Sequence, residues 1–313
     1  MKAMNIRKLA FAAGAVALLG FATSPAKAGV FTEVDLLDGN SNTLAADVSE
    51  LDWFSNSAGA ALTVGPFGTP LVEGQTFDFV YQSRLIGAAN LGGDSVSFAD
   101  TLNSGGAGGA LAGDEYQFTI VASFQEVVVS VAGDAPTQTA IFGLGPNGGT
   151  ISIFYDAVGV DGGGTVSDVV AGTGFDDGIE VARFSLVSQT STFTATSDSS
   201  GIGVASLEAE IVAVLDFVLD EYILGLLAPV FDLEFFATLI FPLNPPASET
   251  TAFHVDGSDF YPDTPVLGDT LLLQVDGFNT FTAQAVPEPR TLLLLALGLV
   301  ALGFAARRWR PTA

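Results

Sequence analysis

The chain of 313 residues lacks cysteine entirely and has a single histidine, His254. The first absence excludes disulfides, thiolate nucleophiles and thiolate metal sites, and both together exclude an ordinary zinc site. A Ser-His-Asp triad would need His254, but the setting Phe253-His254-Val255 is more typical of a strand than of a catalytic base. The glycine motifs of serine hydrolases and P-loop nucleotide-binding proteins are also missing. We therefore expect the protein not to be an enzyme.

Basic residues are scarce between the two ends of the chain. Only two of the ten, Arg84 and Arg183, lie between Gly29 and Val286, whereas all but one of the 35 acidic residues lie there. So acidic a region repels phosphate backbones and anionic lipid headgroups, and we expect no nucleic-acid partner. A solvated acidic surface explains the charge, and attraction of divalent cations is the alternative.

Calcium is the one cofactor that the sequence favours at all, although no cofactor is required. Asp176 and Asp177 precede a glycine, and Asp256 and Asp259 enclose a Gly-Ser pair. Carboxylates beside flexible turns suit hard cations. Neither segment matches the twelve-residue EF-hand loop, and capping of turns by aspartate explains both segments at least as well.

The first 28 residues follow the pattern of a secretory signal peptide. Three basic residues precede an apolar stretch over residues 9–21, and small residues at Ala26 and Ala28 mark a cleavage site before Gly29. The alternative is an N-terminal anchor, but about 13 apolar residues are fewer than the roughly 20 that span a bilayer. The expected partners are therefore the general secretion machinery and signal peptidase.

The C-terminal residues 286–313 contain three elements in a fixed order. Val286, Pro287, Glu288 and Pro289 come first, an uncharged and mostly aliphatic stretch over 291–306 follows, and Arg307, Arg308 and Arg310 close the chain. The two prolines exclude a continuing helix or strand, so this segment is extended and exposed. Residues 291–306 form a helix just long enough to cross the inner membrane, with the arginines on the cytoplasmic side. An ordinary uncleaved anchor is the alternative, and it places the body on the same outer side.

This order resembles the PEP-CTERM sorting signal of Gram-negative bacteria. The resemblance covers residues 286–313 and departs from the family at Arg290, where a small residue is usual. It implies that an exosortase, a membrane-embedded cysteine transpeptidase, recognises Pro-Glu-Pro, removes the tail and releases or re-attaches the body. It also implies transient anchoring in the inner membrane, followed by the cell surface or extracellular matrix.

The body, residues 29–285, is rich in short β-branched and aromatic runs between Gly, Asn and Asp clusters. Alternation, as at Phe77, Phe79 and Tyr81, indicates strands with one buried face. The expected strands are 76–84, 116–131, 139–144, 150–155, 180–187, 191–197, 251–255 and 271–283. We predict one all-β domain, an antiparallel sandwich or jelly-roll-like fold, flanked by the N-terminal signal helix and the C-terminal sorting helix.

Residues 206–243 fit two patterns. Apolar residues recur at both helical and strand spacing, while the Phe and Val content and three closing prolines favour two long strands with a break near Gly225. A helix is the alternative, and the carboxylates of this stretch argue against a membrane span, among them Asp216, Asp220, Glu221, Asp232 and Glu234.

Two glycine-rich segments, 148–156 and 172–178, resemble part of the flocculation-associated PEP-CTERM proteins, which are linked to cell aggregation in exopolysaccharide-forming bacteria. We predict a non-enzymatic surface or matrix protein that supports exopolysaccharide association, biofilm or flocs. The alternatives are an extracellular carbohydrate-active enzyme with two carboxylates and a calcium-dependent carbohydrate-binding module. Both need aromatic rings that face solvent, so burial of Trp53 would weaken both.

Overall fold

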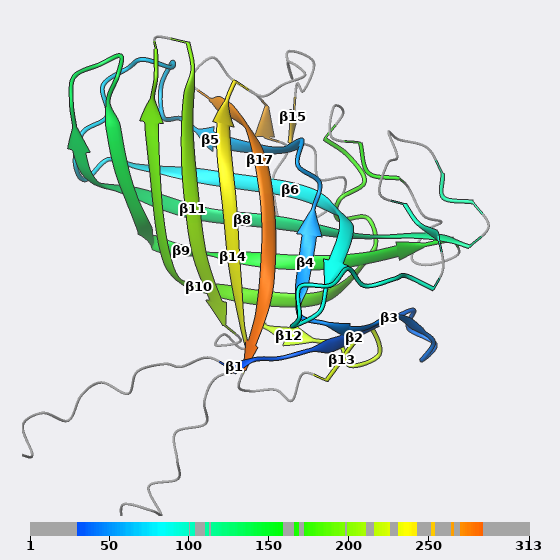
Figure 1. Ribbon diagram of the computed structural model, residues 1–313. Coiled ribbons are helices and arrows are strands. Elements are labelled where there is room, and N and C mark those ends of the chain that lie inside the picture. Colours follow the sequence, from blue (N-terminus) through cyan, green and yellow to red (C-terminus); the bar gives the residue numbers. More distant parts are fainter. Residues whose placement is uncertain are drawn as a thin grey trace, which may run out of the picture. The chain divides into compact units, whose positions relative to one another are not determined.

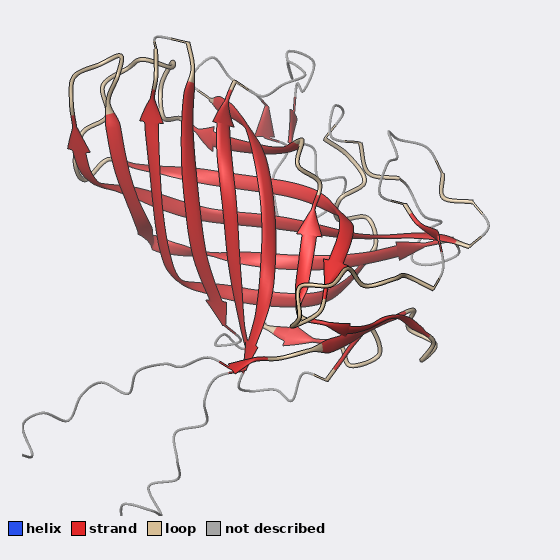
Figure 2. Cartoon of the chain, in the orientation of Figure 1, coloured by secondary structure: helices blue, strands red, loops and turns tan. Residues whose placement is uncertain are grey.

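The structure is a computed structural model. It describes residues 30–99, 101–103, 110–112, 114–158, 166–168, 172–197, 199–210, 216–225, 231–242, 252–253, 264–265 and 270–283. Every regular element among these residues is a strand (Figure 2). Within the same ranges, no helix has the length and apolarity needed to cross a membrane. The predicted signal helix and sorting helix lie outside the described residues.

Eight strands form a closed antiparallel barrel. They are β5 (Ser57–Leu62), β6 (Thr76–Ala89), β8 (Glu115–Ala132), β9 (Thr139–Ala157), β10 (Ile179–Ala195), β11 (Gly201–Glu210), β14 (Phe231–Phe241) and β17 (Leu271–Ala283). Each pairs with the next along the chain, and β17 pairs back onto β5, so the order is that of an up-and-down meander. Figure 1 shows β11, β14 and β17 side by side, with β6 and β8 crossing behind them.

The predicted all-β antiparallel architecture is confirmed, but the sandwich or jelly-roll arrangement is wrong. A sandwich has two sheets with separate edges, whereas here the pairing of Leu272 with Ala60 joins the last strand to the first. Closure pairs both sides of all eight strands, which removes the open edges that attract other chains.

The short strand β4 (Glu50–Trp53) continues the line of β5. Both strands pair with β6 and with β17, β4 further along each partner than β5. Between the two strands, the Phe54 amide still donates to the Arg84 carbonyl of β6 at 2.9 Å, and the Ser57 hydroxyl donates to the Phe54 carbonyl at 2.5 Å. Trp53, the last residue of β4, is completely buried and belongs to the apolar cluster of the barrel interior.

Two predicted pairs of short strands are single long strands. The ranges 139–144 and 150–155 both lie in β9, and 180–187 and most of 191–197 lie in β10. The predicted breaks coincide with shifts of register, since Glu126 pairs with Leu144 while Phe124 pairs with Gly149. A Cβ atom at Gly149 would overlap Phe124, so glycine permits this close approach of the strands.

The ambiguous stretch 206–243 contains strands, as predicted. β11 and β14 pair along ten residues each, from Gly201 opposite Phe241 to Glu210 opposite Asp232. Between them lie β12 (Phe217–Val218) and β13 (Ile223–Leu224), and Gly225 has a left-handed φ of 106°. Of the predicted strand 251–255, Ala252–Phe253 forms β15, which pairs with β16 (Thr264–Pro265).

A three-stranded sheet contributes to the core at the end of the barrel opposite the β5–β6 turn. It consists of β2 (Val34–Leu37), β3 (Thr43–Val48) and β13. Its buried side chains, among them Leu36 and Leu44, belong to the same apolar cluster as the barrel interior. The remaining short strands, β1 (Val30–Phe31), β7 (Thr101–Leu102) and β12, extend the main sheet beside β17, β8 and β10.

Candidate functional site

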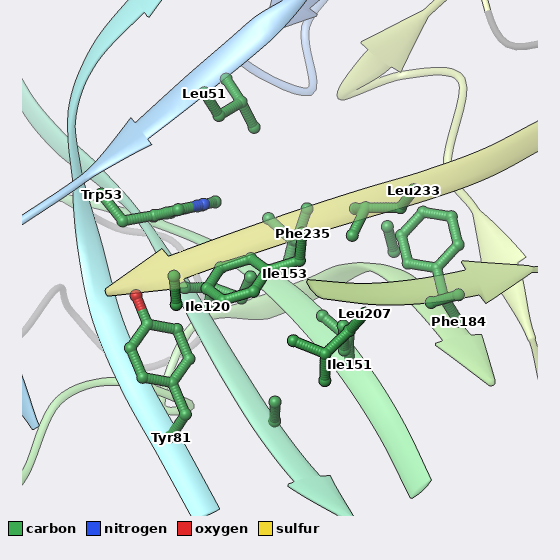
Figure 3. Close-up of a cluster of buried hydrophobic side chains, with 14 of the residues drawn as sticks. Leu51, Trp53, Tyr81, Ile120, Ile151, Ile153, Phe184, Leu207, Leu233 and Phe235 are labelled. Atoms are coloured by element: carbon green, nitrogen blue, oxygen red, sulfur yellow. The ribbon is translucent and has the colours of Figure 1, made fainter. Parts of the chain in front are cut away.

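The barrel interior is packed with large side chains in one half. Trp53, Tyr116, Phe118, Phe184 and Phe281 are all almost completely buried. Figure 3 shows Trp53 projecting from β4 toward the space that Ile120 and Phe235 occupy. The indole Nε1 donates to the Asn279 side-chain oxygen at 2.8 Å, which joins β4 to β17 by a buried hydrogen bond. In this half, large side chains of the described strands fill the interior.

The other half, under the β5–β6 and β8–β9 turns, contains a cavity of about 110 Å³. Small side chains on five different strands leave the space open. They are Ala61 on β5, Ala122 on β8, Ala140 on β9, Ala205 on β11 and Ala237 on β14. Aromatic rings complete most of the wall, including Phe77, Phe124 and Phe142. An eight-stranded barrel is just wide enough for one small ligand when its interior is not filled.

The β5–β6 connection covers this cavity with residues 64–69 and Leu71. Phe67 stacks on Phe241 of β14, with ring centroids 4.2 Å apart, and meets the edge of Phe193 of β10. The Leu71 amide donates to the Gln138 side-chain oxygen at 2.9 Å, and the Gln138 amide nitrogen donates to the Leu71 carbonyl at 3.2 Å. Ring contacts with β10 and β14 and hydrogen bonds to the residue before β9 therefore hold the cover in place.

Glu126 is the acidic residue in the cavity wall. It follows Phe118, Ile120, Ala122 and Phe124 among the inward-facing residues of β8. Only 6% of its surface is exposed. Its Oε1 accepts hydrogen bonds from Ser191 Oγ at 2.9 Å and from Gln189 Nε2. Among the described residues, none donates to Oε2. A carboxyl group is thus held by one oxygen and has the other available to the cavity.

Burial raises the pKa of the Glu126 carboxyl from its ordinary 4.5 to about 7, against the lowering effect of hydrogen bonds from Ser191 and Gln189. Tyr81 is the other ionisable group among the described residues of the wall, and burial raises its pKa as well, so it stays neutral. Near pH 6 the cavity is therefore lined by neutral groups.

Glu126→Gln is expected to change how stability depends on pH. Between about pH 4.5 and 7 the folded protein keeps a proton that the unfolded chain releases, so this contribution to stability falls as pH rises, by up to roughly 3 kcal/mol. Urea unfolding should therefore give similar free energies for both proteins at pH 4 and a more stable variant at pH 8. Glu73→Gln, at an exposed position, is the matched control. Parallel profiles for wild type and Glu126→Gln would contradict the assignment.

The sorting residues Val286, Pro287, Glu288 and Pro289, the arginines Arg307, Arg308 and Arg310, and the cleavage residues Ala26, Ala28 and Gly29 lie outside the described residues. His254, Asp256 and Asp259 lie outside them too. Asp176 is nearly buried and Asp177 half-buried. In the described ranges, no three side chains of His, Cys, Asp or Glu gather in a way that could hold a metal ion. Calcium at Asp176 and Asp177 stays a prediction.

The two glycine-rich segments 148–156 and 172–178 lie against each other on the outside of the barrel. Phe154 of β9 and Phe175 share a small apolar cluster, and the Thr119 hydroxyl of β8 donates to the Phe175 carbonyl at 2.5 Å. A Cβ atom at Gly178 would overlap the Tyr155 carbonyl, so glycine is needed for this contact. The sequence likeness thus falls on one packed unit, in which the second segment covers the outer face of β8 and β9.

The tryptophan and tyrosine side chains that a sugar platform would use are buried wherever they are described. Trp53 has no exposed surface, and the four described tyrosines are at most 7% exposed. A sugar ring stacks on a solvent-facing aromatic side chain, so these residues supply no such surface. Both carbohydrate alternatives lose support.

Sequence reasoning did not single out Glu126. One sign was present, because an acid at the fifth inward position of an apolar alternation breaks the binary pattern. The partners Gln189 and Ser191 lie more than sixty residues away on β10, next to its shift of register, and no local pattern connects them.

Comparison with known proteins identifies the C-terminal segment. Residues 285–308 match the family model of the PEP-CTERM protein-sorting motif. No curated protein and no solved structure matches the chain. The motif implies export, a membrane-anchored C-terminal signal and an exosortase as processing partner. The chain therefore carries the PEP-CTERM sorting motif, and it is an exosortase-sorted extracellular protein.

Proposed function

We propose that the barrel is the non-enzymatic body of a surface or matrix protein that supports exopolysaccharide association and the formation of biofilm or flocs. The observation that carries the proposal is the order along the chain, because the last barrel strand ends at Ala283 and the sorting motif begins at residue 285. A folded body joined so directly to a sorting signal suits a protein that is delivered as a whole to the outside of a Gram-negative cell.

Three features of the body support this role. Its high negative charge favours solubility outside the cell. Its sequence lacks cysteine and has one histidine, so it has no thiolate nucleophile and too few ligands for an ordinary zinc site of Cys and His. Its described tryptophan and tyrosines are buried, which speaks against a sugar-binding module or a sugar-cleaving enzyme with an aromatic platform.

A deletion strain of the native host tests the proposal. Loss of the gene should reduce floc or biofilm mass and the exopolysaccharide retained with the cells, and the wild-type gene should restore both. A gene with Pro287→Ala, Glu288→Ala and Pro289→Ala should not restore them, because the body is intact but its delivery fails. Repeating the complementation with the wild-type gene in excess chelator tests the alternative of a calcium-dependent carbohydrate-binding module. A deletion strain that forms flocs and retains polysaccharide like its parent would contradict the proposal.

A further inference from the structure

We propose that the barrel cavity binds a small, neutral, mostly apolar molecule that carries one acceptor oxygen, such as a ketone, with Glu126 as its hydrogen-bond donor. The inference goes beyond the proposed function and does not depend on it. Its basis is the combination of an unfilled apolar space and one buried carboxyl group that faces it.

The space is built into the strands rather than left by one poorly packed residue. Alanine occupies the inward position on five separate strands, while the opposite half of the same barrel is filled by rings. The cavity lowers the stability of the folded protein. Larger apolar side chains at these positions would bury more surface and remove that cost. A cavity of about 110 Å³ is of the order of the engineered cavity of about 150 Å³ that takes up benzene.

Glu126 determines the chemistry of the ligand. Burying a carboxyl group in an apolar wall without a cationic partner lowers the stability of the folded protein. An apolar residue at this position would make the protein more stable. Exceptions of this kind mark functional sites. Because Oε1 already accepts two hydrogen bonds, the proton of the neutral acid belongs on Oε2, which is then a donor toward the cavity.

Charge excludes other ligand classes. A carboxylate ligand would place two acids together. An ammonium ligand would have to form a desolvated ion pair with Glu126, since the described residues of the wall include no second carboxylate. The remaining wall is mostly aliphatic and aromatic, with Thr69, Gln138, Ser191 and Thr192 as further polar residues of its lining, so we expect the rest of the molecule to be mostly apolar and close to the size of a six-membered ring.

Methyl NMR of the body, residues 29–285, provides the test. Cyclohexanone and toluene are the two probes. Both have the same number of heavy atoms, but only cyclohexanone has an acceptor oxygen. At pH 5.5, cyclohexanone should shift the alanine methyls of Ala140 and Ala237 saturably and leave exposed Ala132 unchanged. It should bind about threefold to tenfold more weakly at pH 8.5, when Glu126 is ionised, whereas toluene binding should not change.

Two variants distinguish the contribution of the carboxyl group to binding from that of the empty space. Glu126→Gln keeps a donor at every pH, so its affinity for cyclohexanone should be the same at pH 5.5 and 8.5. Ala237→Leu should abolish the binding of both probes, and Ala140→Val replaces it if circular dichroism shows that the first does not fold. Absence of saturable shifts at Ala140 and Ala237, equal shifts at Ala132, or unchanged binding in the filled and folded variant would each overturn the proposal.

Discussion

Replacement of Trp53 by alanine is expected to lower the free energy of unfolding by about 3–5 kcal/mol. The side chain has no exposed surface, and its removal leaves a large void between β4 and the interior. It also removes the hydrogen bond of 2.8 Å to Asn279, so a buried acceptor on β17 loses its donor. A loss of this size is a large part of the roughly 5–15 kcal/mol that stabilises a domain.

Urea unfolding of residues 29–285, followed by tyrosine fluorescence and circular dichroism, measures this effect. Trp53→Phe separates its two causes, because it keeps most of the apolar volume and loses only the N–H donor. Phe278→Ala is the matched control, since Phe278 neighbours Asn279 on β17 but is 38% exposed. We expect a small loss for this control and an intermediate one for Trp53→Phe. Equal midpoints for Trp53→Ala and wild type would show that Trp53 does not hold the barrel together.

Local alternation predicted most of the long barrel strands, but none of the five strands β1 to β5 that precede Thr76. β17 begins and ends at the predicted residues, Leu271 and Ala283, and β8 differs from its prediction by one residue at each end. In these strands the apolar residues recur with period two and turn residues stand at both ends, so the pattern contains the needed information.

The barrel could not be predicted in the same way. Sandwiches and barrels both consist of antiparallel strands with one buried face, and they differ in which strands at the two ends of the domain pair. Here that pairing joins β5 to β17, and Trp53 meets its hydrogen-bond partner 226 residues along the chain. A pattern within ten or twenty residues carries no information about such a contact.

The predicted breaks in β9 and β10 show a second limit. Gly145, Pro146 and Gly148 are strong turn formers, and they led to the prediction of two strands over 139–155. In the structure β8 pairs with both parts of β9, and the extra residues are taken up as a shift of register. Gly and Pro therefore mark an irregularity correctly, but a bulge and a turn have similar local sequences.

The sorting signal could be predicted from local sequence, whereas the cavity could not. The signal consists of adjacent residues with opposite physical character, two prolines, an aliphatic run and an arginine cluster, so sequence alone identified it and the family comparison agrees. The cavity needs small residues from five strands and a carboxyl group held by a sixth, β10, and only the folded barrel brings these together.

The triple change Pro287→Ala, Glu288→Ala and Pro289→Ala is expected to stop removal of the C-terminal tail completely. We expect the prolines to keep the segment extended and open to a protease, and alanine to let the predicted apolar helix over 291–306 continue backward through it. The glutamate supplies the single charge between Ala283 and Arg290. The changed residues follow the last barrel strand, which ends at Ala283, and belong to none of its strands, so the barrel should fold and unfold like the wild type.

Arg290→Ser is the matched control for this change. It alters the residue next to the motif toward the small side chain that is usual in the family, and it leaves all three motif residues in place. We expect processing to continue at least as efficiently as in wild type. Failure of this variant to be cut would show that Arg290 itself belongs to the recognised segment.

Intact-mass analysis of the protein recovered from the native host tests the central claim, that the chain is exported and cut at its sorting motif. We predict that the wild-type protein begins at Gly29 and ends between Val286 and Thr291, while the triple variant stays in the membrane fraction with Arg310 still attached. A wild-type protein that retains Arg310 would contradict the account, because the tail would then be a permanent anchor.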